Sequence, residues 1–156
     1  MPGMTIPDRV PIARVRGYRT SHIGRYADGQ FFGSVTATLE SGAGAEPDWR
    51  PHKRWYAVLH RFNPTGDHTG SEIWFAGTSE RERAAIKVAK AHLKASIAAL
   101  PGHTFGNIAI GLFHVEVDGH VFGLVDGSDS FEGVDHAEFL PDSLGFDPPW
   151  NGGYDT

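Results

Sequence analysis

Three runs of the chain have the composition and period of β-strands, and in residues 30–39 one face is more apolar than the other. In residues 54–62 both faces are largely apolar near the start, which predicts a central strand. Residues 30–39 form the first of these runs, and residues 54–62 and 71–76 form a pair on either side of Asn63-Pro64-Thr65-Gly66. Asn at the first place of this tetrapeptide, Pro at the second and Gly at the fourth favour a type I turn followed by a bulge. The pattern therefore predicts one strand and, after it, an antiparallel hairpin.

A second hairpin is predicted further along the chain. Residues 107–117 and 120–125 meet at Asp118-Gly119, a dipeptide typical of the two-residue type I′ turn. The register that this turn sets places four large apolar side chains on one face: Phe113, Val115, Phe122 and Leu124. His114 and Glu116 fall on the other face, because successive side chains of a strand point to opposite sides.

Between the hairpins the apolar period changes to three and four residues, which indicates one long helix over residues 79–100. Ser79 and Glu82 have the spacing of a capping box, and Pro101-Gly102 ends the pattern. The stripe expected to face the sheet consists of Ala85, Ile86, Ala89, Leu93, Ile97 and Leu100. Three lysines are expected on the opposite side of the helix: Lys87, Lys90 and Lys94.

The two ends of the chain show neither period. Residues 1–28, rich in Pro, Gly and Arg, are interpreted as an irregular basic arm, and residues 126–156 as an irregular acidic tail. The tail carries widely spaced apolar side chains suited to covering a sheet: Phe131, Phe139, Leu140, Leu144, Phe146, Trp150 and Tyr154. The sequence thus predicts a single α+β domain over residues 1–156. We expect a mainly antiparallel sheet of about five strands, with the helix on one face and the aromatic tail on the other.

Charge is divided unevenly along the chain. All 14 Lys and Arg side chains lie within residues 1–100, whereas residues 101–156 hold ten of the 19 acidic side chains. A surface of one sign attracts partners of opposite sign and speeds their association. Six acidic residues are therefore predicted to bind a basic protein partner: Asp126, Asp129, Glu132, Asp135, Glu138 and Asp142. The alternative is that the N-terminal arginines neutralise this segment within one molecule.

Composition excludes several further classes of site. The chain has no cysteine, which rules out disulfides, thiolate zinc sites and a cysteine nucleophile. Residues 1–9 lack the apolar run of a signal peptide, and no stretch approaches the roughly 20 apolar residues that span a bilayer. We expect a cytoplasmic protein with no membrane contact. The sequence also lacks phosphate loops, dinucleotide fingerprints and the Gly-x-Ser-x-Gly elbow, so no cofactor is expected.

Candidate chemistry is limited to a few polar side chains on the predicted strands. Nine histidines are present, but none forms a His-x-His or His-x-x-x-His pair, so no metal site is expected. His114 and Glu116 share one face of a strand, and Tyr56 and His60 lie on the first hairpin. These four side chains are candidates for acid–base catalysis or ligand binding in a pocket between sheet and tail. The competing interpretation of His114 and Glu116 is a polar pair at the end of a hairpin.

Much of the chain also shows a family resemblance. The residues that carry it are YRT (18–20), HIGRY (22–26), GQFF (29–32), KRWYAVLHRF (53–62), IWFAGT (73–78), VEVDG (115–119), FGLV (122–125), PW (149–150) and YDT (154–156). With these segments the chain resembles a family of small bacterial proteins labelled formate hydrogenlyase regulatory protein. The resemblance implies a non-enzymatic regulator of gene expression or of enzyme assembly, and it assigns no functional residue.

Two functions of different class remain open at this stage. The first is a non-catalytic interaction or regulatory protein, for example a stoichiometric inhibitor or immunity-type module that binds a basic partner through the acidic C-terminal third. The second is a small enzyme or ligand-binding domain with a pocket between the sheet and the tail. A homodimer through the tail or an uncovered sheet face is a further alternative. Nucleic acid is not expected as a partner, because the acidic third would repel phosphate groups.

Overall fold

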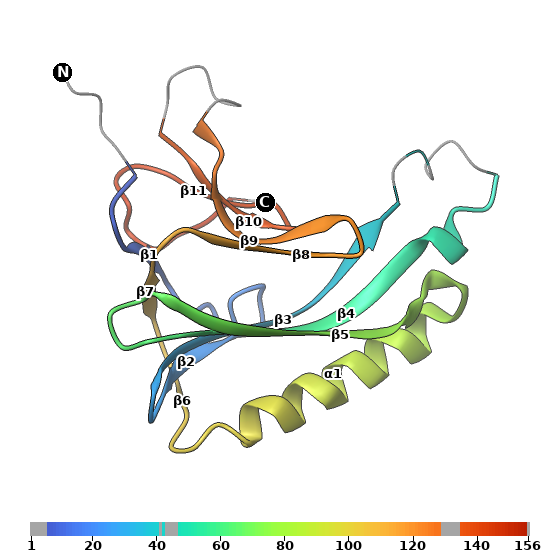
Figure 1. Cartoon of the computed structure of the whole chain (residues 1–156), viewed down its shortest axis with the longest axis horizontal. Helices are drawn as coiled ribbons and strands as arrows, with labels where there is room; N and C mark the ends of the chain where they lie inside the picture. The colour runs from blue at the N-terminus through green and yellow to red at the C-terminus, as the bar shows by residue number, and fades with distance from the viewer. Residues whose placement is uncertain (1–5, 41, 43–46, 129–134, 156) are drawn as a thin grey trace.

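The computed structural model describes residues 6–40, 42, 47–128 and 135–155. It shows an α+β fold in three layers, with a single long helix below a five-stranded antiparallel sheet and a second, four-stranded antiparallel sheet above it (Figure 1). The predicted fold class is confirmed. The layering is physically simple, because the central sheet is apolar on both faces and each face must be covered.

The central sheet has the strand order β5-β4-β3-β2-β6. Its strands are β2 (His22–Tyr26), β3 (Gly29–Leu39), β4 (Lys53–Phe62), β5 (His68–Thr78) and β6 (Thr104–Phe105). The predicted strand and first hairpin are therefore both present. β4 lies in the middle of the sheet, which explains why both of its faces are apolar.

The turn of the first hairpin has the predicted form. The Gly66 amide donates to the Asn63 carbonyl at 3.0 Å, and the register of β4 and β5 shifts between Arg61 and Phe62. Gly66 has a φ of +97°, a conformation that costs a glycine little and other residues much more. The bulge after the turn is thus fixed by this glycine.

The predicted helix is also confirmed, as a 3₁₀ turn at Ser79–Arg81 that continues into α1 (Glu82–Ala98). The helix start differs from a simple capping box. Thr78 is the residue that caps the 3₁₀ turn, with its hydroxyl accepting from the Glu80 amide. The Ser79 hydroxyl instead donates to the Glu82 carboxylate at 2.8 Å and accepts from the indole of Trp55 at 2.9 Å. This pair of bonds ties the start of the helix to β4.

The apolar stripe of α1 packs on the face of the central sheet formed by β3 and β4. Ala89, Leu93 and Ile97 are buried there against Phe31 and Leu59. Gly33 of β3 faces the helix, and a Cβ atom at this position would lie 2.9 Å from Leu93 Cδ1 and 3.2 Å from Ile97 Cδ1. Because contacts this short are repulsive, glycine at this position sets how closely the helix approaches the sheet.

The second hairpin forms with the predicted register. β8 (Phe113–Val117) and β9 (His120–Asp126) pair with Phe113 opposite Leu124 and Val117 opposite His120. Asp118 and Gly119 both have positive φ, 54° and 79°, as the type I′ turn requires.

The long strand predicted over residues 107–117 is wrong in its extent. It is interrupted after β7 (Ile108–Ile110), which turns away to pair with β1 (Val10–Ile12) in a separate two-stranded sheet. Gly111 and Leu112 lie between β7 and β8 and belong to neither strand.

The C-terminal segment covers the second sheet face, as expected, but its described part is more regular than predicted. β10 (Ala137–Leu140) and β11 (Leu144–Phe146) extend the second hairpin into the four-stranded sheet β11-β10-β9-β8. Both strands are short and lie among Pro, Gly and Asp residues, so the sequence shows no clear β-strand period for them. Phe139 stacks on Phe32 of the central sheet with ring centroids 4.0 Å apart, so this segment is part of the main core. Phe131 lies outside the described residues.

Two further predictions differ from the structure. The second hairpin belongs to the upper sheet and does not share a sheet with the helix-facing strands. The N-terminal arm, expected to be irregular, contributes β1 and β2 within its described part. Both strands are too short to show a period in the sequence. The paired residues of β1 and β7 lie 96 to 100 positions apart. β2 pairs with its sequence neighbour β3 and, on its other side, with β6, 79 to 81 positions away.

Candidate functional site

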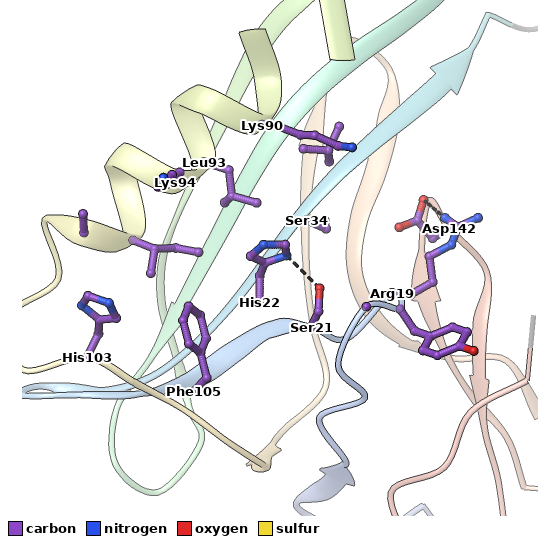
Figure 2. Close-up of a pocket in the computed structure, with 15 residues that line it drawn as sticks. Arg19, Ser21, His22, Ser34, Lys90, Leu93, Lys94, His103, Phe105 and Asp142 are labelled. Atoms are coloured by element: carbon purple, nitrogen blue, oxygen red, sulfur yellow. Dashed lines mark hydrogen bonds and ion pairs between the residues drawn. The ribbon is translucent and has the colours of Figure 1, made fainter. Parts of the chain in front are cut away.

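A groove opens between the C-terminal half of α1 and the neighbouring strands β2 and β3 (Figure 2). Its volume of about 750 Å³ falls within the range of roughly 300–1,000 Å³ that is usual for small-molecule sites. The walls are built by side chains from segments far apart in the sequence: residues 17–22, 34–35, 90–98, 103–105 and 142. The groove is therefore a product of the tertiary fold.

The floor of the groove is apolar. Leu93 and Ile97 of α1 reach into it from the core between helix and sheet, and Val35 of β3 adjoins them. Phe105 of β6 closes one end and keeps 45% of its surface exposed. Its ring is fixed by an edge contact with Phe31 at 6.0 Å and by the Arg14 guanidinium, which lies 4.8 Å over it.

Cationic side chains surround this floor. Lys90 and Lys94 extend from α1, and Arg19 extends from the loop before β2. The sequence placed the lysines on the far side of the helix, but Lys90 and Lys94 flank the buried stripe and line the groove. Their long apolar stems suit such a position beside buried leucine and isoleucine. Among the described residues, neither lysine has a carboxylate within 4.0 Å.

His22 lies on the same wall, where its Nδ1 atom is 3.0 Å from the Ser21 hydroxyl (Figure 2). Desolvation lowers the pKa of His22 below its ordinary value of 6.5, and the positive charges of Arg14 and Lys90 lower it further. The contributions of Arg14 and Lys90 show that this wall of the groove has a positive potential, in addition to the main effect of desolvation. At neutral pH His22 is thus a neutral hydrogen-bonding group among cations.

Asp142 is the acidic side chain that lines the groove. It comes from the turn between β10 and β11, accepts a hydrogen bond from the Thr36 hydroxyl and lies 3.4 Å from the Arg19 guanidinium. Only 15% of the Asp142 side chain is exposed, and this burial raises its pKa against the opposing effects of Thr36 and Arg19. An anion is therefore already bound at Arg19, supplied by the protein itself.

The predicted candidates His114 and Glu116 do not take part in this site. Both are exposed on β8, on the face turned away from the core, while Phe113 is buried on the opposite face. The alternation of the strand explains the outcome, because the face with the large apolar residues is the one that packs on the central sheet.

Tyr56 and His60 are buried instead between the two sheets. The Tyr56 hydroxyl donates to Asp118 at 2.7 Å and accepts from Arg54 at 3.0 Å, which links β4 to the turn of the second hairpin. His60 Nδ1 lies 2.6 Å from the Ser71 hydroxyl, and burial, with a smaller effect of His68, lowers the pKa of His60 to about 3. The structure therefore does not bring the four predicted catalytic candidates together.

The acidic residues predicted to bind a partner separate into groups. Asp142 is engaged in the groove, and Asp129 and Glu132 lie outside the described residues. Asp126 is exposed at the end of β9, where hydrogen bonds from Ser128 lower its pKa. Asp135 and Glu138 are half-buried close by, and no Lys, Arg or His nitrogen in the described part of the chain lies within 4.0 Å of these three carboxylates.

Sequence reasoning missed the groove for a definable reason. Lys90 and Lys94 at a spacing of four residues beside Leu93 and Ile97 are a local signal of a cationic edge on the apolar stripe. The other side chains, Arg19 and Asp142, join them only through tertiary contacts that no local pattern encodes.

No group of three or more His, Asp or Glu side chains able to hold a metal ion occurs among the described residues. Within the same residues, no helix has both the length and the apolar character needed to cross a membrane. Comparison with protein-family models, curated proteins and solved structures gives no match to the chain.

Proposed function

We propose that the protein is a non-catalytic ligand-binding domain whose groove between α1 and β2–β3 holds a small organic anion. The observation that carries this proposal is the arrangement of Lys90, Lys94 and Arg19 around an apolar floor, with Asp142 as the opposing charge. Concave sites with an apolar lining and a few convergent polar groups are the usual form of small-molecule sites.

The electrostatics favour an anion over a cation or a neutral ligand. Two opposite unit charges 4 Å apart attract by about 1 kcal/mol in bulk water and by about 4 kcal/mol near a protein surface. Lys90 and Lys94 are available for such an interaction, because neither is paired with a carboxylate in the described part of the protein. Arg14 and Lys90 both lower the pKa of His22, in addition to the larger effect of desolvation, and these two contributions support the same sign of local potential.

Binding is favoured over catalysis by the composition of the walls. Ser21 and His22 form a hydroxyl–imidazole pair at 3.0 Å, as a nucleophile and base would. Among the described side chains, however, no carboxylate lies within 4.0 Å of His22 to orient the ring. We therefore assign the groove to binding.

Titration calorimetry with sodium octanoate tests the proposal. The double variant Lys90→Gln/Lys94→Gln removes two charges while keeping side-chain length, and it is expected to weaken octanoate binding at least tenfold. The matched control is Lys87→Gln, which removes an exposed charge from the same helix away from the groove. Equal affinity of the double variant and the control would contradict the proposal, as would equal binding of octanoate and octylammonium.

A second candidate function is supported by carboxylates beside the upper sheet that have no Lys or Arg partner within the described part of the chain. Asp126, Asp135 and Glu138 form an acidic edge that suits a basic protein partner, in keeping with a regulatory role in the cytoplasm. Such a partner, captured from lysate, should be retained more weakly by Asp126→Asn/Glu138→Gln than by the control Glu80→Gln. If neither the double substitution nor added salt weakens capture, this surface is not the binding site.

A further inference from the structure

We infer that the ligand is a free amphiphilic anion, with its charged head at the Arg19–Lys90 end of the groove and its apolar body extending along Leu93 and Ile97 to Phe105. This inference rests on the proposed function and adds the class and orientation of the ligand.

The two ends of the groove differ in chemistry. Figure 2 shows Arg19, Asp142 and Lys90 toward one end and Phe105 with His103 at the other, with Leu93 and His22 between them. Lys90 and Ala98, both lining residues, are eight positions apart in α1, which corresponds to about 12 Å along the helix axis. A charged group and an apolar body can thus be held at separate places in one site.

The head end is suited to an anion because it already holds one. Asp142 lies 3.4 Å from Arg19 and accepts from Thr36, so the polar groups there are arranged around a carboxylate. Lys90 stands nearby without a carboxylate partner of its own among the described residues. The head end therefore has a positive charge, on Lys90, that Asp142 does not neutralise.

The apolar end offers surface that the protein leaves uncovered. Phe105 is 45% exposed although it is a large aromatic residue, and Ala98 brings further apolar surface to the groove. Each methylene group of a ligand that is removed from water raises its affinity about fourfold. A ligand with a hydrocarbon portion should therefore bind this floor more tightly than one without.

The shape of the site indicates a free molecule. The groove is a recess of about 750 Å³ between a helix and a sheet, which suits a single small molecule. A lipid whose tail stays in a bilayer could present only its head to this recess, leaving the apolar floor unused.

Calorimetry with a series of linear alkanesulfonates from butane- to decanesulfonate, kept below micelle formation, tests the inference. The sulfonate stays ionised at all relevant pH values, so only chain length varies. We expect affinity to rise about three- to fourfold per methylene until the groove is filled. Trimethylammonium compounds of equal chain length are expected to bind at least tenfold more weakly.

Three helix variants test the orientation of the ligand in the groove. Ala98→Glu places a carboxylate at the apolar end and should remove most of the gain from chain length while butanesulfonate still binds. Ala95→Glu, at an exposed position of the same helix outside the groove, is the control and should behave as the wild type. Lys90→Gln should weaken all chain lengths by the same factor.

The outcomes separate the two proposals. Failure of octanoate and of every sulfonate to bind would overturn the proposed function itself. Binding that does not depend on chain length, or that Ala98→Glu leaves unchanged, would overturn the amphiphile inference while the anion site stands. Binding to anionic phospholipid vesicles without binding to monomeric sulfonates would also contradict the inference.

Discussion

Asp142 shows how a single side chain connects the C-terminal segment with the groove. It lies in the β10–β11 turn, yet its carboxylate faces Arg19 of the N-terminal segment. This ion pair is a case of the self-neutralisation that the uneven charge distribution allowed, and it involves one of the six acidic residues predicted to bind a partner. An anionic ligand must share Arg19 with Asp142 or displace it.

Replacing Asp142 by asparagine should therefore strengthen anion binding. The substitution keeps a carbonyl oxygen to accept from Thr36 but removes the charge that competes with the ligand for Arg19. We expect octanesulfonate affinity to rise about fivefold, measured by calorimetry above the pKa of Asp142, and the advantage to shrink as pH falls. If Asp142→Asn weakened binding, Asp142 would be a positioning residue for Arg19 and not a competitor.

His60 makes the stability of the protein depend on pH. Its pKa is lowered to about 3 in the folded state, mainly by burial, against 6.5 when unfolded. The unfolded state therefore binds more protons between these values, and the stability that neutral His60 provides is present above pH 6.5 and is lost as pH falls. The expected loss is about 1.4 kcal/mol per pH unit below 6.5 from this residue.

Urea unfolding at several pH values between 7.5 and 5 measures this contribution. His60→Asn is expected to be less stable at pH 7.5 but to show a smaller loss of unfolding free energy toward pH 5. His114→Asn, at an exposed strand position, is the control and should keep the wild-type slope. Equal slopes for all three proteins would show that His60 is not responsible.

At the scale of elements, the structure depends on how closely α1 approaches the central sheet. Gly33 permits this approach, since a Cβ atom there would meet Leu93 and Ile97 at 2.9 and 3.2 Å. The same two residues form the groove floor, so the packing of the helix and the shape of the site are linked.

Gly33→Ala should destabilise the protein by about 1–3 kcal/mol, the usual cost of overpacking a core. It should also weaken octanesulfonate binding, because the floor residues must shift. Gly106→Ala is a matched control, since a Cβ atom at Gly106 has no neighbour within 4 Å. Thermal unfolding of both variants is the measurement, and equal melting temperatures would contradict the role given to Gly33.

The elements that sequence predicted correctly are those with local signals. The two hairpins have turn residues whose φ angles the sequence specifies, and the helix has a stripe of four- and three-residue spacing ending at Pro101. What could not be predicted is pairing between distant segments. β1 pairs with β7 across 96 to 100 residues and β2 with β6 across 79 to 81, and strands of two to five residues show no usable period.

At the scale of the whole molecule, charge is separated between layers. The helix layer carries Lys87, Lys90 and Lys94, whereas the four-stranded sheet carries exposed or half-buried acids such as Glu116, Asp126 and Glu138 (Figure 1). The basic and acidic parts of the sequence also meet in the fold, through the pairs Arg54–Asp118 and Arg19–Asp142. The groove is lined by three cationic side chains, Lys90, Lys94 and Arg19, and by the carboxylate of Asp142, which favours its use for anions.

The most direct test of the account is to map the ligand site by NMR. In a ¹⁵N–¹H spectrum titrated with octanesulfonate, the account predicts shift changes confined to residues 17–22, 34–35, 90–98 and 103–105 and around Asp142. The amide signals of His114 and Glu116, on the outer face of the upper sheet, should not shift. Shifts that cluster on that outer face, or that are absent at saturating ligand, would contradict the account.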